Sequence, residues 1–233
     1  MPLPEYFSPL NGKHVTIVAF GDSITATTHW TRGMMNWVQL LEQNLHSVFR
    51  SGGTVINSGV SGDSLPNCLG RLDRDVLRFK PDIVIVSFGA NDARRRNPEE
   101  FRKMYREMLR QIKAAGALIV TRTPTPYISM SDGSEITEVT ERGNLVKVDV
   151  EGYANIIRQV SEEMGILCVD HYSLWKRSLQ SIYKGEMMLL MGNCIHPNGE
   201  GHRRLYHEMA PFFGLPRYFQ QDYENILAEE GMI

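Results

Sequence analysis

Short apolar runs alternate with helix-length amphipathic stretches along most of the chain, and this alternation limits the fold more than any other sequence feature. The clearest run is Asp82–Phe88 (DIVIVSF), which is continuous and rich in β-branched residues, as is typical of a strand buried on both faces. Helices of about 12 to 18 residues between such strands favour right-handed crossovers and a parallel sheet. We therefore predict a three-layer α/β/α domain with a parallel sheet of about five strands.

The predicted strands are short and apolar: Val15–Phe20, Thr54–Asn57, Asp82–Phe88, Ala117–Thr121 and Ile166–Asp170. The predicted helices are the longer amphipathic stretches: Gly33–Phe49, Pro66–Phe79, Pro98–Ala115, Val150–Met164 and Asn198–Phe212. In Pro66–Phe79 the apolar face comprises Leu69, Leu72, Val76 and Leu77. Ligands of parallel sheets bind beyond the carboxyl ends of the strands, so the motifs that follow strands are expected to meet there.

Two segments do not fit the alternation. Thr123–Lys147 is long, polar and turn-rich, which predicts a functional lid or a disordered loop. Gly214–Ile233 carries several aromatic and aliphatic residues, and two interpretations are open for it: a helix packed on the body or a dimer contact. We therefore divide the chain into one domain, residues 1–213, and a tail, residues 214–233.

Composition favours a soluble, small-molecule-binding domain. The net charge of −2 gives no electrostatic drive toward nucleic acid or a membrane, and the apolar runs are too short to span a bilayer. The cysteines, Cys68, Cys168 and Cys194, form no C-x-x-C pair, so neither a disulfide framework nor a thiolate zinc site is expected. The first ten residues lack the basic and apolar regions of a secretory signal, which predicts a cytoplasmic protein. Homo-oligomerisation stays open, and we expect no metal or cofactor.

The first chemical motif is Phe20–Ile24 (FGDSI), directly after the first predicted strand. A short helix beginning near Ser23 would aim backbone N–H groups at an anion. A serine hydroxyl is a weak nucleophile and needs a nearby base. On its own, the motif equally fits a loop serine that caps a helix.

Two further motifs follow the next strands. Asn57–Ser64 (NSGVSGDS) reads as a glycine-rich turn, or as a loop whose Gly62 N–H donates to an oxyanion. Gly89–Asp92 (GAND) reads as an Asx-turn, or as a loop whose Asn91 side-chain amide is a second donor. Losing one such donor costs about 10²–10³ in rate.

The last motif is Asn193–Pro197 (NCIHP), just before the final predicted helix. A single histidine there is most simply a surface residue, yet His196 could accept a serine proton and return it to a leaving group. Other hydrolase and nucleotide-binding signatures are missing from the sequence, namely G-x-S-x-G, G-x-G-x-x-G and Walker A.

The order of these motifs resembles the SGNH (GDSL-like) hydrolase family. The matches are GDS at Gly21–Ser23, the glycine at Gly62, G-x-N-D at Gly89–Asp92, and H-P at His196 and Pro197. The resemblance implies a flavodoxin-like fold with Ser23 as nucleophile and His196 as base. It also implies an oxyanion hole made by the Ser23 N–H, the Gly62 N–H and the Asn91 side chain. Family members act mostly on esters, including acetylated sugars, lysophospholipids and thioesters.

The chain departs from the family pattern at the triad acid, where Asn193 replaces the usual aspartate. Asparagine can accept a hydrogen bond from the histidine but supplies no charge, and the same exchange in chymotrypsin-type proteases costs roughly 10⁴ in turnover. Three explanations compete. Another acceptor, such as a backbone carbonyl or Glu200, compensates; the enzyme works with a Ser–His dyad; or the substitution, natural or engineered, inactivates the site.

Some neighbouring residues have two interpretations. Arg94, Arg95 and Arg96 are most simply a solvated charged face, the alternative being that one of them borders the site. Trp30 and Met34 could line an acyl pocket or belong to the core. His202 is expected to pack on the last helix or to cap it.

Three functions therefore compete. The first is an esterase that removes small acyl groups, such as acetyl from a carbohydrate. The second is a lysophospholipase or thioesterase, which predicts best activity on acyl chains of about eight carbons or more. The third is a non-catalytic binding module, for which Asn193 is the only support. If His196 is the base, we expect the rate to respond to pH between about 5 and 8.

Overall fold

The computed structural model describes residues 5–45, 52–94, 97–141, 143–180 and 184–215. Residues 46–49 of one predicted helix, two of the three consecutive arginines (95 and 96) and all but two residues of the 214–233 tail lie outside this part. The interpretations placed on them stay predictions.

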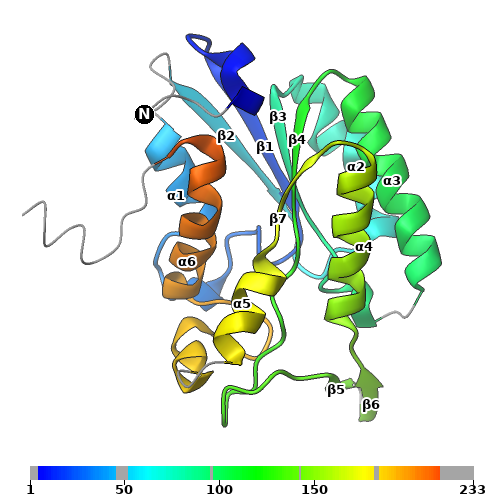
Figure 1. Cartoon of the computed structure of the whole chain (residues 1–233), viewed down its shortest axis with the longest axis vertical. Helices are drawn as coiled ribbons and strands as arrows, with labels where there is room; N and C mark the ends of the chain where they lie inside the picture. The colour runs from blue at the N-terminus through cyan, green and yellow to red at the C-terminus, as the bar shows by residue number, and fades with distance from the viewer. Residues whose placement is uncertain (1–4, 46–51, 95–96, 142, 181–183, 216–233) are drawn as a thin grey trace, which may run out of the picture.

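A five-stranded parallel sheet forms the centre of the domain, in the order β2-β1-β3-β4-β7 (Figure 1). Its strands are β1 (Val15–Gly21), β2 (Gly53–Gly59), β3 (Ile83–Ser87), β4 (Leu118–Arg122) and β7 (Leu167–Val169). The predicted three-layer α/β fold is confirmed. Across the sheet, Gly21 pairs with Gly59 on one side and with Ser87 on the other. These three strand ends are level, so the loops that follow them lie side by side.

Helices cover both faces of the sheet (Figure 1). One face carries α2 (Leu65–Asp75), α3 (Pro98–Ala114) and α4 (Val150–Glu163), and the other carries α1 (Trp37–Leu45), α5 (His171–Leu179) and α6 (Gly199–Met209). Short 3₁₀ helices connect them at Glu5–Leu10, His29–Thr31, Leu77–Phe79, Asp92–Arg94, Lys184–Leu190 and Ala210–Phe213. No helix in these described segments has the length and apolar character needed to cross a bilayer.

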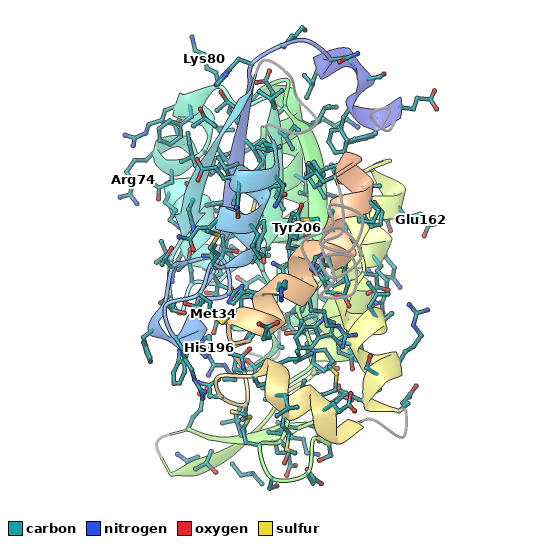
Figure 2. The ribbon with its side chains drawn as sticks, turned by 90° about the vertical axis from the view of Figure 1, so that its left-hand side faces the viewer. Met34, Arg74, Lys80, Glu162, His196 and Tyr206 are labelled. Atoms are coloured by element: carbon teal, nitrogen blue, oxygen red, sulfur yellow. The ribbon has the colours of Figure 1, made fainter. Side chains whose placement is uncertain are left out.

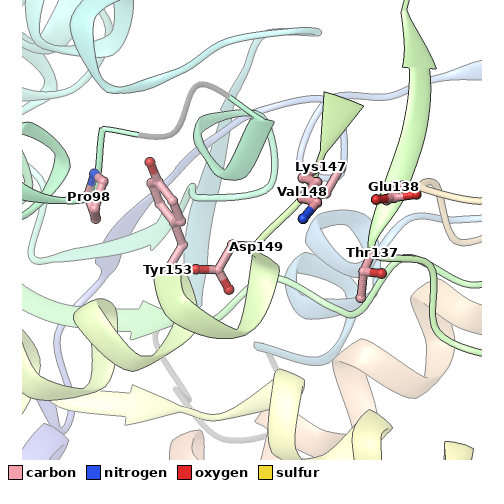
Figure 3. A pocket seen from close by; sticks show the side chains of 7 residues that line it. All are labelled: Pro98, Thr137, Glu138, Lys147, Val148, Asp149 and Tyr153. Carbon is pink, nitrogen blue, oxygen red and sulfur yellow. The ribbon is translucent and has the colours of Figure 1, made fainter. Parts of the chain in front are cut away.

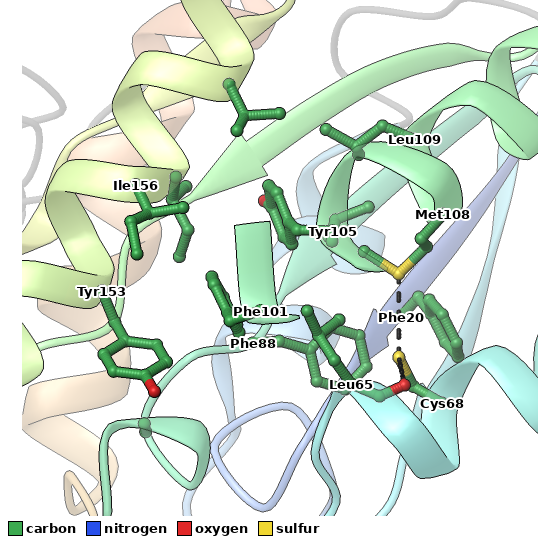
Figure 4. Close-up of a cluster of buried hydrophobic side chains, with 14 of the residues drawn as sticks. Phe20, Leu65, Cys68, Phe88, Phe101, Tyr105, Met108, Leu109, Tyr153 and Ile156 are labelled. Carbon is green, nitrogen blue, oxygen red and sulfur yellow. Dashed lines mark hydrogen bonds between the residues drawn. The ribbon is translucent and has the colours of Figure 1, made fainter. Parts of the chain in front are cut away.

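Each face of the sheet has its own core. Alternate residues of β1 point to opposite sides, with Val18 and Phe20 in one cluster and Ile17 and Ala19 in the other. In the first cluster, the rings of Phe20 and Phe88 meet edge to face with centroids 5.0 Å apart. Figure 4 shows this cluster. The ends of β1 and β3 are thus anchored directly beneath the loops that follow them.

Helix α1 begins four residues later than predicted. The Asn36 Oδ1 accepts hydrogen bonds from the backbone N–H groups of Val38 and Gln39, each at 3.0 Å. This side chain caps the helix, so residues 33–36 stay outside it.

The apolar face predicted for α2 is partly wrong. The buried side chains are Leu65, Cys68, Arg71 and Leu72, whereas Leu69 is only partly buried. The true buried face is rotated and includes a charged residue.

The prediction for Thr123–Lys147 needs correction. Tyr127 and Ile128 are buried in the body of the domain. The later part forms an antiparallel hairpin, β5 (Glu138–Glu141) and β6 (Asn144–Lys147), at the end of the domain where the strands finish. Its short strands are mostly exposed and polar, so they lack the apolar alternation that identifies a strand from sequence.

Candidate active site

The nucleophile candidate stands in a tight turn directly after β1. A Cβ atom added at Gly21 would lie 2.1 Å from the Thr25 Oγ1 and 2.8 Å from the Ser87 carbonyl oxygen, so only glycine fits. The N–H groups of Thr25 and Ala26 both donate to the Asp22 carbonyl oxygen, at 3.1 and 3.0 Å. The short helix predicted at Ser23 is wrong, because this single turn does not continue.

Ser23, His196 and Asn193 are joined by hydrogen bonds. The Ser23 Oγ lies 2.9 Å from the His196 Nε2, and the His196 Nδ1 lies 3.1 Å from the Asn193 Oδ1. The Asn193 Oδ1 also accepts the backbone N–H groups of Ile195 at 2.8 Å and His196 at 2.7 Å. These two donors hold the amide with its oxygen toward the ring. His196 therefore carries its proton on Nδ1 and leaves Nε2 free to accept one from Ser23.

The environment of His196 is apolar on one side and positive on the other. The Trp30 ring stacks on the imidazole, with centroids 5.3 Å apart and planes 6° apart. Burial, followed by the positive fields of His29 and Arg94, lowers the pKa of His196 to about 4. Glu200, suggested as a replacement acid, pairs with Arg203 on its own helix instead.

Figure 2 shows Met34 and His196 near each other. Met34 is half exposed and packs against Gly199, where α6 begins. Trp30 packs on Gly192 as well as on His196. His202 lies within α6 rather than against it, is buried, and accepts the Trp37 N–H on its Nδ1 at 3.4 Å.

The two predicted oxyanion donors, the Gly62 N–H and the Asn91 side chain, are both connected to Asp63. Gly62 has a φ of 76°, which favours glycine, and directly precedes Asp63 in the chain. The Asn91 Nδ2 donates to the Asp63 carbonyl oxygen at 2.9 Å. The Asn91 Oδ1 accepts the Arg94 Nη2 at 2.7 Å, so one arginine of the run contacts the site.

Arg71 ties the ends of β1 and β2 to the loop that follows β2, and sequence reasoning missed it. Its buried guanidinium donates to the carbonyl oxygens of Gly21 at 3.0 Å and Ser58 at 2.9 Å, and to the Asp63 carboxylate at 2.7 Å. It also lies over the Phe20 ring, 4.5 Å from the centroid. The available signal was weak: Arg71 lies three residues after Cys68 on a predicted helix, a spacing that shares one face.

A separate hollow of about 560 Å³ lies between the hairpin and the start of α4 (Figure 3). Its lining residues are Pro98, Thr137, Glu138, Lys147, Val148, Asp149 and Tyr153. None of the proposed catalytic residues lines it. In the part of the chain that the structure covers, no three His, Cys, Asp or Glu side chains are grouped so as to hold a metal ion.

Comparison with known proteins identifies the class to which this fold and site belong. The model of the GDSL-like Lipase/Acylhydrolase family matches residues 19–204. The chain therefore belongs to that family of ester hydrolases. The family's motifs lie in the loops that follow the strands.

Named relatives span more than one activity. An acetylxylan esterase from Geobacillus stearothermophilus is 26% identical over 160 residues, which cover 65% of this chain and 68% of the relative. Thioesterase 1/protease 1/lysophospholipase L1 from Escherichia coli (strain K12) is 30% identical over 116 residues, which cover 48% of this chain and 53% of the relative.

Solved structures share the fold. The crystal structure of an acetylxylan esterase from Geobacillus stearothermophilus superposes with a TM-score of 0.71 and 22% identity, covering 90% of this chain and 98% of that chain. A hydrolase from the metagenome of Lake Arreo gives a TM-score of 0.69 and 24% identity, covering 91% and 98%.

Proposed function

We propose that this chain is a serine esterase that hydrolyses small acyl esters, acetyl esters of carbohydrates in particular, through an acyl-serine intermediate. The observation that carries the proposal is the Ser23 Oγ, 2.9 Å from a His196 Nε2 whose other nitrogen is held by Asn193. The acetylxylan esterases among the relatives support the choice of acetyl group.

The relatives also support the roles of the three residues. Solved structures of the acetylxylan esterase include catalytic mutants in which a serine, an aspartate or a histidine is replaced by alanine. The aspartate and the histidine are three positions apart in that enzyme, as Asn193 and His196 are here. We assign Asn193 to the position of the aspartate.

In the proposed reaction, the Ser23 Oγ attacks the ester carbonyl carbon while the His196 Nε2 takes its proton. The oxyanion is stabilised by the Ser23 N–H, the Gly62 N–H and the Asn91 Nδ2. His196 then gives the proton to the departing alcohol oxygen. Water attacks the acyl group by the same route, releases the acid and restores Ser23.

The pH profile is the first expected result. Activity requires neutral His196, which persists above its pKa and is lost as the pH falls through it. Because that pKa is lowered to about 4, kcat/KM for p-nitrophenyl acetate should be flat between pH 5 and 8 and fall by half near pH 4. The structure thus moves the expected acid limb below the range that the sequence suggested. An acid limb near the ordinary histidine value would contradict this placement of His196.

The second expected result concerns the missing charge. Asn193→Asp should raise kcat/KM about 100-fold, because a carboxylate beside the imidazolium stabilises it by about 1–3 pKa units. The gain is smaller than the roughly 10⁴ of a chymotrypsin-type triad, because Asn193 already holds the correct tautomer. The same change should move the acid limb to higher pH. An unchanged rate and an unchanged limb would show that Asn193 does not act through His196.

A series of p-nitrophenyl esters from acetate to decanoate tests the acyl preference. We expect kcat/KM to be highest for acetate and to fall with chain length, and acetylated xylo-oligosaccharides to release acetate. A maximum at eight carbons or more would contradict the acetyl preference and favour the thioesterase and lysophospholipase activities of the Escherichia coli relative. No hydrolysis of any ester would favour the binding module.

A further inference from the structure

Arg94 lies beside the proposed oxyanion hole, although its place in an arginine run suggested a solvated face. Its side chain is only 26% exposed. The Nη2 donates to the Asn91 Oδ1 at 2.7 Å, and the Nη1 pairs with Glu141 on the β5–β6 hairpin. One guanidinium therefore connects the hairpin with the Asn91 amide.

We propose that Arg94 is a positioning residue that holds the Asn91 amide with its nitrogen, rather than its oxygen, toward the oxyanion. The inference rests on the proposed function and assigns a role that none of the family motifs carries. Its basis is that each end of the Asn91 amide has its own hydrogen-bond partner: the Asp63 carbonyl oxygen for the nitrogen, and the Arg94 guanidinium for the oxygen.

A carboxamide has two ends of nearly equal size but opposite polarity. A rotation of about 180° would exchange the Asn91 oxygen and nitrogen and present an acceptor to the oxyanion, where it repels instead of stabilising. The Asp63 carbonyl oxygen only accepts, and it receives the Asn91 Nδ2 at 2.9 Å. The Arg94 guanidinium only donates. Together they satisfy one orientation and oppose the other.

The charge of Arg94 adds a second effect. A hydrogen bond from a cation to the amide oxygen draws electron density from the nitrogen and makes its N–H groups better donors. Glu141 holds the guanidinium from the other side, so that it stays directed at Asn91. Arg94 also contributes to the lowered pKa of His196, which places its charge within electrostatic reach of the catalytic pair.

The test starts with Arg94→Met, which keeps an unbranched apolar stem but removes the guanidinium and its donors. We expect kcat for p-nitrophenyl acetate to fall roughly 10- to 50-fold, less than the 10²–10³ that follows loss of an entire oxyanion donor. KM should change little, because the ground-state ester carries no oxyanion charge. Arg94→Lys should recover part of the loss. The control is Arg110→Met, which removes an exposed arginine paired with Glu107 on α3 and should leave kcat unchanged.

A double-mutant cycle separates positioning from a structural role. If Arg94 acts through Asn91, then Arg94→Met should lower kcat less than twofold in an Asn91→Ala background. If the double variant loses the product of the two single losses in kcat, the residues act independently and the proposal is overturned. A kcat of Arg94→Met equal to that of the wild type would overturn it too. If Arg94→Met does not fold, Arg94→Ala replaces it in the cycle.

The proposed function is tested separately in the same experiment. If the wild-type chain is active, losses that multiply overturn the role of Arg94 alone and leave the esterase in place. A wild-type chain that hydrolyses no ester overturns the proposed function, and the role of Arg94 with it.

Discussion

Ser23→Ala is expected to lower kcat/KM for p-nitrophenyl acetate by about 10⁴–10⁶, the range found when a nucleophilic serine is removed from a hydrolase. The reason is the hydrogen bond between the Ser23 Oγ and the His196 Nε2, which are 2.9 Å apart. Without it, His196 has no hydroxyl to activate, and the substrate faces only water. Initial rates at pH 7 measure the loss.

The matched control for this substitution is Ser131→Ala, which removes an exposed hydroxyl from the loop that precedes the hairpin. Its rate should equal that of the wild type. Circular dichroism should show that both variants keep the fold, since Ser23 contributes only a hydroxyl. Activity retained by Ser23→Ala would contradict its role as nucleophile, whatever the other residues do.

Arg71→Met is expected to lower the free energy of unfolding by about 3–5 kcal/mol, the usual cost of breaking a buried ion pair from one side. The side chains of Arg71 and Asp63 are only 8% and 3% exposed. Without the guanidinium, the Asp63 carboxylate stays buried without its counter-ion. The carbonyl oxygens of Gly21 and Ser58 lose a donor at the same time. Urea titration followed by fluorescence measures the change.

Arg74 provides the control, because it lies on the same helix but is 68% exposed and pairs with Asp75 at the surface. Arg74→Met should leave the free energy of unfolding close to that of the wild type, because exposed ion pairs add little to stability. The double variant Arg71→Met with Asp63→Asn should be more stable than Arg71→Met alone, since it leaves no buried charge unpaired. A double variant no more stable than Arg71→Met would show that the carboxylate is not the source of the loss.

The sheet was predictable because its central strands, β1, β3 and β4, are almost wholly buried and therefore appear in the sequence as continuous apolar runs. Asp82–Phe88 is the clearest case, and β3 lies within it. The location of the candidate active site could be predicted from the sheet, because the carboxyl ends of parallel strands lie at one edge. That rule alone put the loops after β1, β2 and β3 together, and the contacts of Gly21, Asp63 and Asn91 join them.

The sequence did not predict contacts between residues that are far apart in the chain and belong to no motif. The orientation of the Asn193 amide depends on two backbone N–H groups that face it only once the turn has formed. Arg71 drew no prediction and Arg94 was interpreted as part of a charged face, and only the tertiary fold places them against Asp63 and Asn91. The hairpin was missed because its strands are short and mostly exposed, with only partial burial of residues such as Val139.

Labelling with a fluorophosphonate tests the central claim most directly, because the reagent forms a stable adduct only with an activated serine in a hydrolase site. The adduct is mapped by mass spectrometry of peptides, alongside the residual hydrolysis of p-nitrophenyl acetate. We predict one modified peptide, carrying the label on Ser23, and a loss of hydrolysis in proportion to labelling. Hydrolysis that continues with Ser23 unmodified, or a label on another residue that abolishes it, would contradict the account.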